Sequence, residues 1–299
     1  MGEVGSFSAR IPTIALEKCA FVFGNYRVFA QPVSFLVLRA ILDGVRGKQL
    51  PEAALVCNFA APTATDPGLM NYDDVITFFH EFGHVMHWTL SAQRWAGISG
   101  TSMEPDFLEA PSEMLEEWMH SPQVLASFAH HYKTGKPIPA DLVERMNRAS
   151  AFGRASVVAR QLAYSAISYR IHKDNPQRVE LDSICVNELR HYTFFIPIDA
   201  DAHQYASFDQ LASYSSGYYT YMWDRVIAED FFRQFNQNNL LSGDVPMRYR
   251  RLVLEPGGSM SANDLVRSFL GRPQNTIAFE YWLGEEFESL GHGRQPSKE

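Results

Sequence analysis

The sequence is poor in the features that mark membrane-spanning, secreted and disulfide-bonded proteins. No stretch approaches the roughly 18 apolar residues that a membrane-spanning helix needs. Residues 1–10 have neither the basic nor the apolar part of a signal peptide, so we expect no targeting segment there. The 3 cysteines, Cys19, Cys57 and Cys185, are odd in number and widely spaced. We therefore predict buried free thiols and a reducing, cytoplasmic location.

Basic clusters are also scarce. The chain has 26 Lys and Arg against 34 Asp and Glu, and Arg248, Arg250 and Arg251 form its densest basic group. Nucleic acids and membranes are therefore not expected as partners. With 299 residues, 46% of them hydrophobic and 20% charged, the composition excludes collagen, coiled-coil and disordered classes and indicates a globular protein.

Short runs of β-branched and aromatic residues within the first 60 residues predict a small sheet. These runs lie at 20–23, 26–29, 33–38 and 54–59. From Asp73 the apolar spacing changes to the helical period, with a stripe at Val75, Phe78, Phe79, Phe82, Val85, Met86 and Leu90. Further helices are expected at 105–119, 140–149, 152–172, 179–192, 218–235 and 262–270. The predicted fold is mainly α with a small N-terminal β-sheet, in one mainly helical domain.

The motif HExxH lies inside the predicted helix that begins at Asp73. It places His80 and His84 four residues apart, on one helix face, as two ligands of a tetrahedral zinc ion require. Glu81, next to the first ligand, is placed to reach a metal-bound water. His87 is expected to pack or support rather than to bind the metal.

A catalytic zinc ion needs a third protein ligand and an open fourth position. We prefer Glu109, on a second predicted helix that crosses the first. Spacing alone leaves Glu104, Asp106 and Glu113 open, because each lies within one turn or loop of Glu109.

Longer segments around this motif resemble the zinc peptidase family of thimet oligopeptidase, neurolysin, oligopeptidase A and dipeptidyl carboxypeptidase. The resemblance is carried, in the family's order, by residues 51–59 (PEAALVCNF), 79–87 (FHEFGHVMH), 99–101, 106–112, 207–232 and 255–272. It implies a zincin-like metallopeptidase catalytic domain at 51–290. A short N-terminal segment with strands at 1–50 precedes this domain, and a flexible tail at 291–299 follows it.

The resemblance also implies the site. One zinc ion would be held by His80, His84 and Glu109, with Glu81 as the general base for attack of zinc-bound water on the peptide bond.

Tyrosines in a Gly-rich loop complete the implied site. Tyr214 and Tyr221 match the family's donors to the oxyanion or the scissile carbonyl, and Tyr218 matches a contact to the substrate backbone. Tyr219 and Trp223 are expected in the aromatic core.

The sequence departs from the family at the same loop. Gln210, which we expect to contact substrate, stands where the family has a histidine, and glutamine cannot become a cation. Ser213 replaces a glycine, while Gly217 remains as a hinge. The nearby His203 is a candidate substitute for the missing histidine.

Family members also carry a long helical region that forms the other wall of a substrate channel, whereas here 72 residues precede Asp73. We therefore interpret the chain as a catalytic half. The apolar surface left uncovered should favour self-association, and selection by peptide size should weaken.

The predicted function is that of a metalloendopeptidase of the oligopeptidase type, which hydrolyses internal bonds of short or unfolded peptides. Two alternatives stay open. The first is a dipeptidyl carboxypeptidase, and the second is a truncated, non-catalytic, zinc-containing protein that binds peptides.

Overall fold

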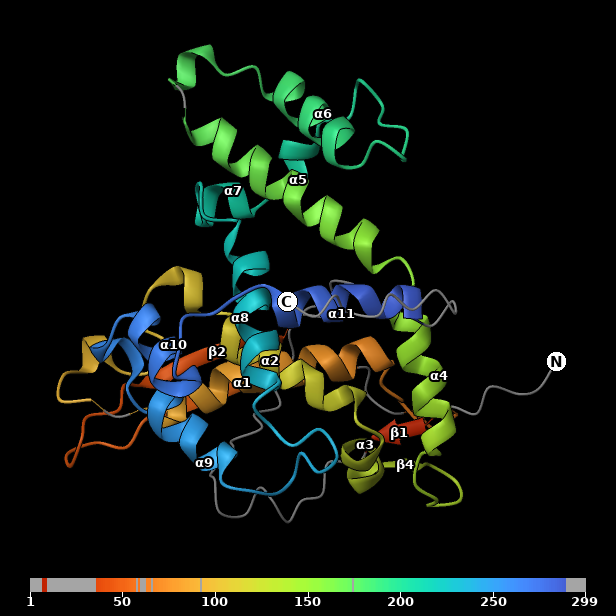
Figure 1. Cartoon of the computed structure of the whole chain (residues 1–299), viewed down its shortest axis with the longest axis vertical. Coiled ribbons are helices and arrows are strands. Elements are labelled where there is room, and N and C mark those ends of the chain that lie inside the picture. Colours follow the sequence, from red (N-terminus) through yellow and green to blue (C-terminus); the bar gives the residue numbers. More distant parts are fainter. Residues whose placement is uncertain are drawn as a thin grey trace.

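The computed structural model describes residues 7–9, 36–57, 59, 63–65, 67–91, 93–173 and 175–288. Helices make up most of this part of the chain, and the strands form two small two-stranded sheets (Figure 1). The predicted fold, mainly α with a small N-terminal β-sheet, is confirmed.

The first sheet is the hairpin of β2 (Leu36–Leu42) and β3 (Glu52–Cys57), which run antiparallel with Leu36 opposite Cys57. The predicted strands at 33–38 and 54–59 overlap these two. The runs at 20–23 and 26–29 lie outside the described residues. A second antiparallel pair joins β1 (Phe7–Ala9) to β4 (Ala129–His131) and was not predicted.

The helix that carries the HExxH motif, α1 (Tyr72–Leu90), begins and ends close to the predicted bounds. Asp74 caps its start by accepting the Asn71 backbone N–H at 3.1 Å. One side packs on the β2–β3 hairpin, where Trp88 Nε1 donates to the Leu42 carbonyl at 3.1 Å. The sheet therefore supports α1 from behind and leaves another side for α2.

Ten further α-helices follow in the described part of the chain. They are α2 (Ala110–Glu116), α3 (Pro122–Phe128), α4 (Ala140–Ala151), α5 (Arg154–Lys173), α6 (Leu181–Tyr192), α7 (Gln210–Ser213), α8 (Thr220–Phe232), α9 (Val245–Tyr249), α10 (Ala262–Leu270) and α11 (Ile277–Glu288). The single helix predicted at 105–119 is wrong in its continuity. It consists of a 3₁₀ turn at Pro105–Phe107, then α2, then a second 3₁₀ turn at Glu117–His120. Proline at 105 and 111 has no N–H to continue a helix and is tolerated only in a first turn.

The described residues form two hydrophobic clusters. The larger one joins α2, α3, α8 and α10 in the body of the molecule, around Phe107, Phe231 and Leu265. The smaller one lies between α5 and α6, where Ile167 and Cys185 are fully buried. The thiol of Cys185 is thus buried as predicted, whereas the side chains of Cys19 and Cys57 lie outside the described residues.

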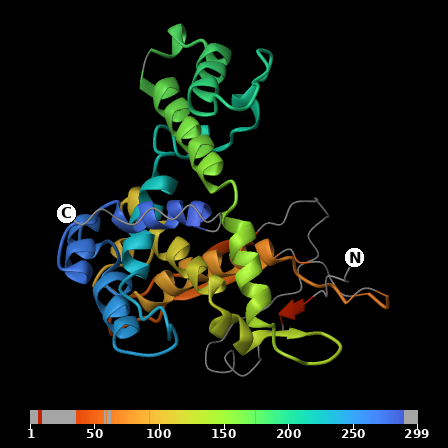
Figure 2. The same cartoon turned by 45° about the vertical axis from the view of Figure 1, so that its right-hand side comes forward.

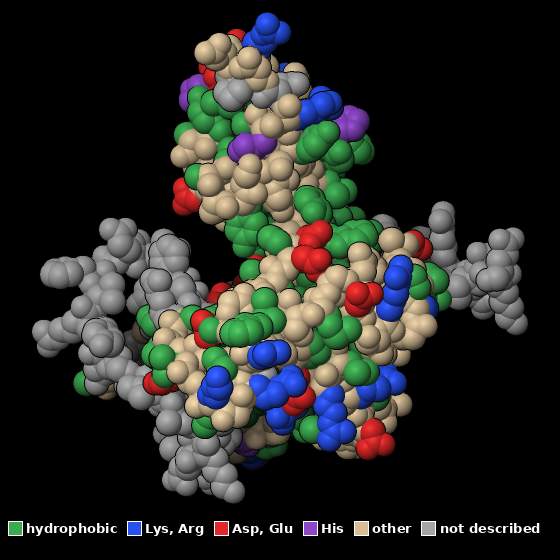
Figure 3. Space-filling view, turned by 90° about the vertical axis from the view of Figure 1, so that its left-hand side faces the viewer, with side chains coloured by type: hydrophobic (Ala, Val, Ile, Leu, Met, Phe, Trp, Pro, Cys, Tyr) green, Lys and Arg blue, Asp and Glu red, His purple; other side chains and the backbone are tan. Residues whose placement is uncertain are grey.

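Helices α5, α6 and α7 form a lobe that rises from the body (Figure 2). The chain enters this lobe just after α4, at Gly153, whose φ of 78° is in the left-handed region that glycine adopts readily. It returns through Gly217 into α8. Hydrophobic side chains gather at the narrow neck between lobe and body (Figure 3).

A close contact at Gly83 sets the distance between α1 and α2. A Cβ atom at this position would lie 2.6 Å from the Ser112 Cα, so the two helix backbones can approach only because residue 83 has no side chain. The same contact brings Glu109, the residue at the start of α2, towards His80 and His84 of α1.

We expect Gly83→Ala to destabilise the protein by about 1–3 kcal/mol, because overpacking against backbone outweighs the better helix propensity of alanine. Gly284→Ala in α11 is the matched control. Apart from its chain neighbours and the backbone of its own helix, no atom of the described residues lies within 4 Å of its added Cβ, so it should stabilise the protein by up to about 1 kcal/mol. Denaturant unfolding of both variants measures the difference, and equal stabilities would contradict the proposed close contact.

Candidate metal centre

Three side chains from α1 and the start of α2 converge on one point. The Nε2 atoms of His80 and His84 lie 3.2 and 3.1 Å from the same oxygen, Oε2 of Glu109. The two imidazole rings stand nearly perpendicular, with centroids 5.0 Å apart. Among the described residues this is the group of three whose ligand atoms all lie within 4.8 Å of one another.

The donor set and its spacing fit a zinc ion. Two imidazole nitrogens and one carboxylate oxygen are the ligands of a catalytic zinc site that keeps its fourth position open. Ligand atoms at zinc-binding distance and tetrahedral angles are about 3.4 Å apart, close to the nitrogen–oxygen distances found here. The three side chains therefore need little movement to surround a cation.

The other three acidic candidates have different partners. Glu104 accepts the backbone N–H of Ala262 at the start of α10, and Asp106 accepts the Tyr219 hydroxyl at 3.0 Å. Glu113 is buried, and this burial raises the pKa of its carboxyl well above the usual value. Among the four, only Glu109 reaches the two imidazoles.

Neighbours on three sides fix Glu109. Its backbone N–H donates to Asp224 of α8 at 2.8 Å, and the Ser112 hydroxyl lies 3.3 Å from Oε2. The Tyr214 hydroxyl donates to the remaining oxygen, Oε1, at 3.4 Å. Burial, together with the charge of Glu109, raises the pKa of Asp224 to about 8. Sequence reasoning missed Asp224, which lies on a helix far along the chain.

The charged groups of the cluster shift one another's pKa values. Burial lowers the pKa of His80, but its contacts to Glu109 and Glu116 outweigh this and raise it to about 10. Burial raises the pKa of Glu109, but the hydrogen bonds from His80 and His84 hold it well below the usual range. These contacts therefore favour an imidazolium at His80 beside an ionised carboxylate at Glu109.

The remaining polar residues of α1 take different places. Glu81 is half-buried next to His80. His87 is fully buried, neither of its ring nitrogens has a hydrogen-bond partner among the described residues, and burial lowers its pKa to about 3. His87 thus packs inside the fold and stands apart from the cluster, as predicted.

The tyrosine loop lies at the neck, beside the cluster. The rings of Tyr214 and Tyr218 each lie near that of Tyr221, with centroids 5.5 and 5.1 Å away. Tyr218 is buried in the smaller hydrophobic cluster, and its hydroxyl donates to Gln161 of α5 at 3.0 Å. Ser215 has a φ of 54°, and its carbonyl accepts the Ser168 hydroxyl at 2.6 Å. The loop is therefore tied to α5.

Two aromatic predictions are wrong. Tyr219 and Trp223 are 47% and 42% exposed rather than part of the core. Tyr219 caps the start of α8 and Trp223 follows one turn later, so the two share a helix face that is open to solvent. His203 is exposed and pairs with Asp182 of α6 at 2.6 Å. Gln210, at the start of α7, is half-buried.

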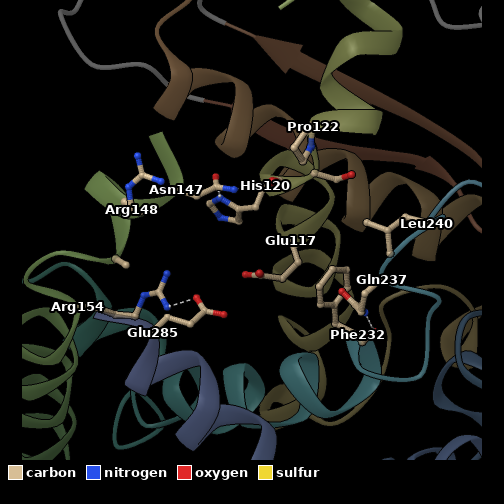
Figure 4. A pocket seen from close by; sticks show the side chains of 12 residues that line it. Glu117, His120, Pro122, Asn147, Arg148, Arg154, Phe232, Gln237, Leu240 and Glu285 are labelled. Carbon is tan, nitrogen blue, oxygen red and sulfur yellow. Dashed lines mark hydrogen bonds and ion pairs between the residues drawn. The ribbon is translucent and has the colours of Figure 1, made fainter. Parts of the chain in front are cut away.

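A cavity of about 450 Å³ lies elsewhere in the body, between α4, α11 and the end of α8 (Figure 4). Its wall includes Glu117, His120, Arg148, Arg154 and Glu285, but none of the three clustered residues. Arg154 and Glu285 form an ion pair in its wall at 2.9 Å (Figure 4). The cavity is thus separate from the candidate metal centre.

Two histidines one helical turn apart, with a carboxylate from a second helix, are the ligand set of metal-dependent peptidases that carry HExxH. Comparison with known proteins agrees with this class. The model of peptidase family M3 matches residues 20–285, so the chain belongs to that family.

The chain also matches part of several longer curated relatives. It is 35% identical over 240 residues to thimet-like oligopeptidase of Dictyostelium discoideum, a match that covers 79% of this chain and 36% of the relative. It is 33% identical to oligopeptidase A of Escherichia coli, covering 78% and 35%, and 33% identical to dipeptidyl carboxypeptidase of the same species, covering 75% and 34%. The chain thus spans about a third of the length of these relatives. Within its described part, no helix is long and apolar enough to cross a bilayer.

Because the pKa of His80 is about 10 without metal, zinc must displace its Nε2 proton at pH 7. We expect the measured enthalpy of zinc binding to vary linearly with the ionisation enthalpy of the buffer. The slope of this line gives the number of protons released per zinc ion bound, and it should be about one or more. Calorimetry in two buffers of different ionisation enthalpy tests this. A slope of zero would contradict a charged His80.

Proposed function

We propose that this chain is the catalytic part of a zinc-dependent oligopeptidase that hydrolyses internal bonds of short or unfolded peptides. The observation that carries the proposal is the convergence of His80, His84 and Glu109 in a chain of peptidase family M3. The names of the relatives, oligopeptidase A and thimet-like oligopeptidase, support the substrate class.

The three clustered side chains would hold the metal. A bound zinc ion supplies Lewis-acid polarisation of the substrate carbonyl and lowers the pKa of water. Glu81 lies on α1 directly beside His80. We assign it the role of general base, which accepts the proton of the attacking water and delivers it to the leaving amine.

Tyr214 and Tyr221 are the proposed donors to the oxyanion. Burial raises the pKa of both phenols, so each keeps its proton at neutral pH and can donate a hydrogen bond. The contact of Tyr214 with Glu109 places its hydroxyl beside the cluster. We assign Tyr218, Gln210 and Gly217 to substrate binding, at the neck where the tyrosine loop meets α8.

The proposal predicts that Glu81→Gln retains zinc but loses nearly all turnover, because glutamine keeps the shape of the side chain and cannot accept the proton. Metal content and cleavage of an internally quenched, C-terminally amidated peptide should be measured on wild type, chelated protein and the variant. A variant with one zinc ion and unchanged cleavage would remove Glu81 as the base.

Tyr221→Phe should lower kcat by about 10²-fold if the hydroxyl donates to the oxyanion. The matched control is Tyr169→Phe on α5, an exposed tyrosine that lies outside the proposed site and should leave kcat unchanged. Equal rates for both variants would assign Tyr221 to packing alone.

A dipeptidyl carboxypeptidase is the second candidate, favoured by the 33% identity to the E. coli enzyme of that name. Such an enzyme needs a free C-terminus, so amidation of the peptide should abolish cleavage, whereas an endopeptidase should still cut. Zinc binding without cleavage of either peptide would favour the non-catalytic, peptide-binding alternative.

Self-association remains part of the proposal. It is supported by apolar side chains that face solvent on the described surface, including Phe152 at 76% and Phe194 at 82% exposure.

A further inference from the structure

His80 contacts a second carboxylate through its other ring nitrogen. Nδ1 lies 2.6 Å from Oε1 of Glu116, the last residue of α2, while Nε2 faces Glu109. A histidine that binds a cation through Nε2 must carry its proton on Nδ1, and an acceptor at Nδ1 favours that tautomer. Within the described part of the chain, His84 has no carboxylate at its Nδ1.

Arg225 of α8 holds Glu116 in this position. Its Nη1 lies 3.3 Å from Oε2 of Glu116, so both oxygens of the carboxylate are engaged. The same nitrogen donates to the backbone carbonyl of Glu113 at 3.2 Å. The guanidinium lies over the ring of Trp282 of α11, 4.9 Å from its centroid. Because both the main chain of α2 and an indole ring fix Arg225, the carboxylate of Glu116 has little freedom.

We propose that Glu116, held by Arg225, is a positioning residue that sets the tautomer and ring orientation of His80 for metal binding. The inference rests on the proposed function in one respect, that the cluster binds a divalent cation. It adds that affinity for the metal depends on a chain of contacts that runs from α8 through the end of α2 to α1.

The alternative hypothesis is that Glu116 has only a structural role, joining α2 to α8 through its ion pair with Arg225. The next residue supplies a matched control, since Glu117 lies 3.4 Å from the same Arg225 nitrogen and is also largely buried. Its side chain points into the cavity (Figure 4), whose wall includes none of the three clustered residues. A purely structural role therefore predicts similar effects for the two glutamates, whereas a positioning role predicts an effect on metal binding for Glu116 alone.

The test uses the full 299-residue chain with Glu116→Gln, Glu116→Ala, Glu117→Gln and His80→Ala. The zinc Kd is measured by competition with a chromophoric chelator, and the melting temperature is measured on metal-free protein. We expect Glu116→Ala to raise the zinc Kd by about 10- to 100-fold. Glu116→Gln, which keeps an acceptor without its charge, should raise it less, and Glu117→Gln should change it by less than about twofold.

Equal zinc Kd values for the Glu116 and Glu117 variants would overturn the inference, as would a loss of affinity that only parallels a loss of melting temperature. If Glu116→Ala does not fold, the near-isosteric pair Glu116→Gln and Glu117→Gln decides the question by the same comparison. Failure of the wild type to bind zinc, or wild-type affinity in His80→Ala, would instead overturn the metal centre and the proposed function with it. The two kinds of failure are therefore distinguishable.

Discussion

Charge burial at the junction of α1, α2 and α8 is the constraint around which the rest of the molecule is arranged. Glu109, Glu113 and Glu117 are each less than a tenth exposed, and an unpaired carboxylate in such a place costs roughly several kcal/mol. Each of the three meets this cost differently. The imidazoles of His80 and His84 contact Glu109, the guanidinium of Arg225 lies beside Glu117, and burial raises the pKa of Glu113 well above its usual value, which favours its uncharged form. Each of these contacts requires α1, α2 and α8 to keep their relative positions.

Contacts of the backbone set the relative positions of these three helices. The hairpin behind α1 and the missing side chain at Gly83 set how closely α2 can approach, while the bond from the Glu109 N–H to Asp224 ties α2 to α8. The tyrosine loop then joins the same arrangement through Tyr214. The three side chains of the cluster are thus held by contacts within the protein itself, an arrangement that lowers the reorganisation needed when charged groups act on a ligand.

The sequence allowed some of this to be predicted and not the rest. The bounds of α1 and the facing pair His80 and His84 follow from local periodicity, which needs no knowledge of distant segments. The choice of Glu109 over its acidic neighbours did not follow from spacing, because it depends on how one short helix crosses another. Glu116 and Arg225 were missed for the same reason: they meet only through tertiary packing of α2 against α8. The outward positions of Tyr219 and Trp223 were mispredicted because aromatic content alone does not show which side of a helix faces solvent.

The lobe of α5, α6 and α7 affects where the sequence of such a chain can vary during evolution. It leaves the body at Gly153 and rejoins it at Gly217, and it has its own hydrophobic cluster. Insertions or substitutions in α5 and α6, away from Tyr214, would therefore change the surface of the lobe while α1 and α2 keep their packing. The lobe is thus a part of the chain whose length and surface can vary with little cost to the packing of α1 against α2.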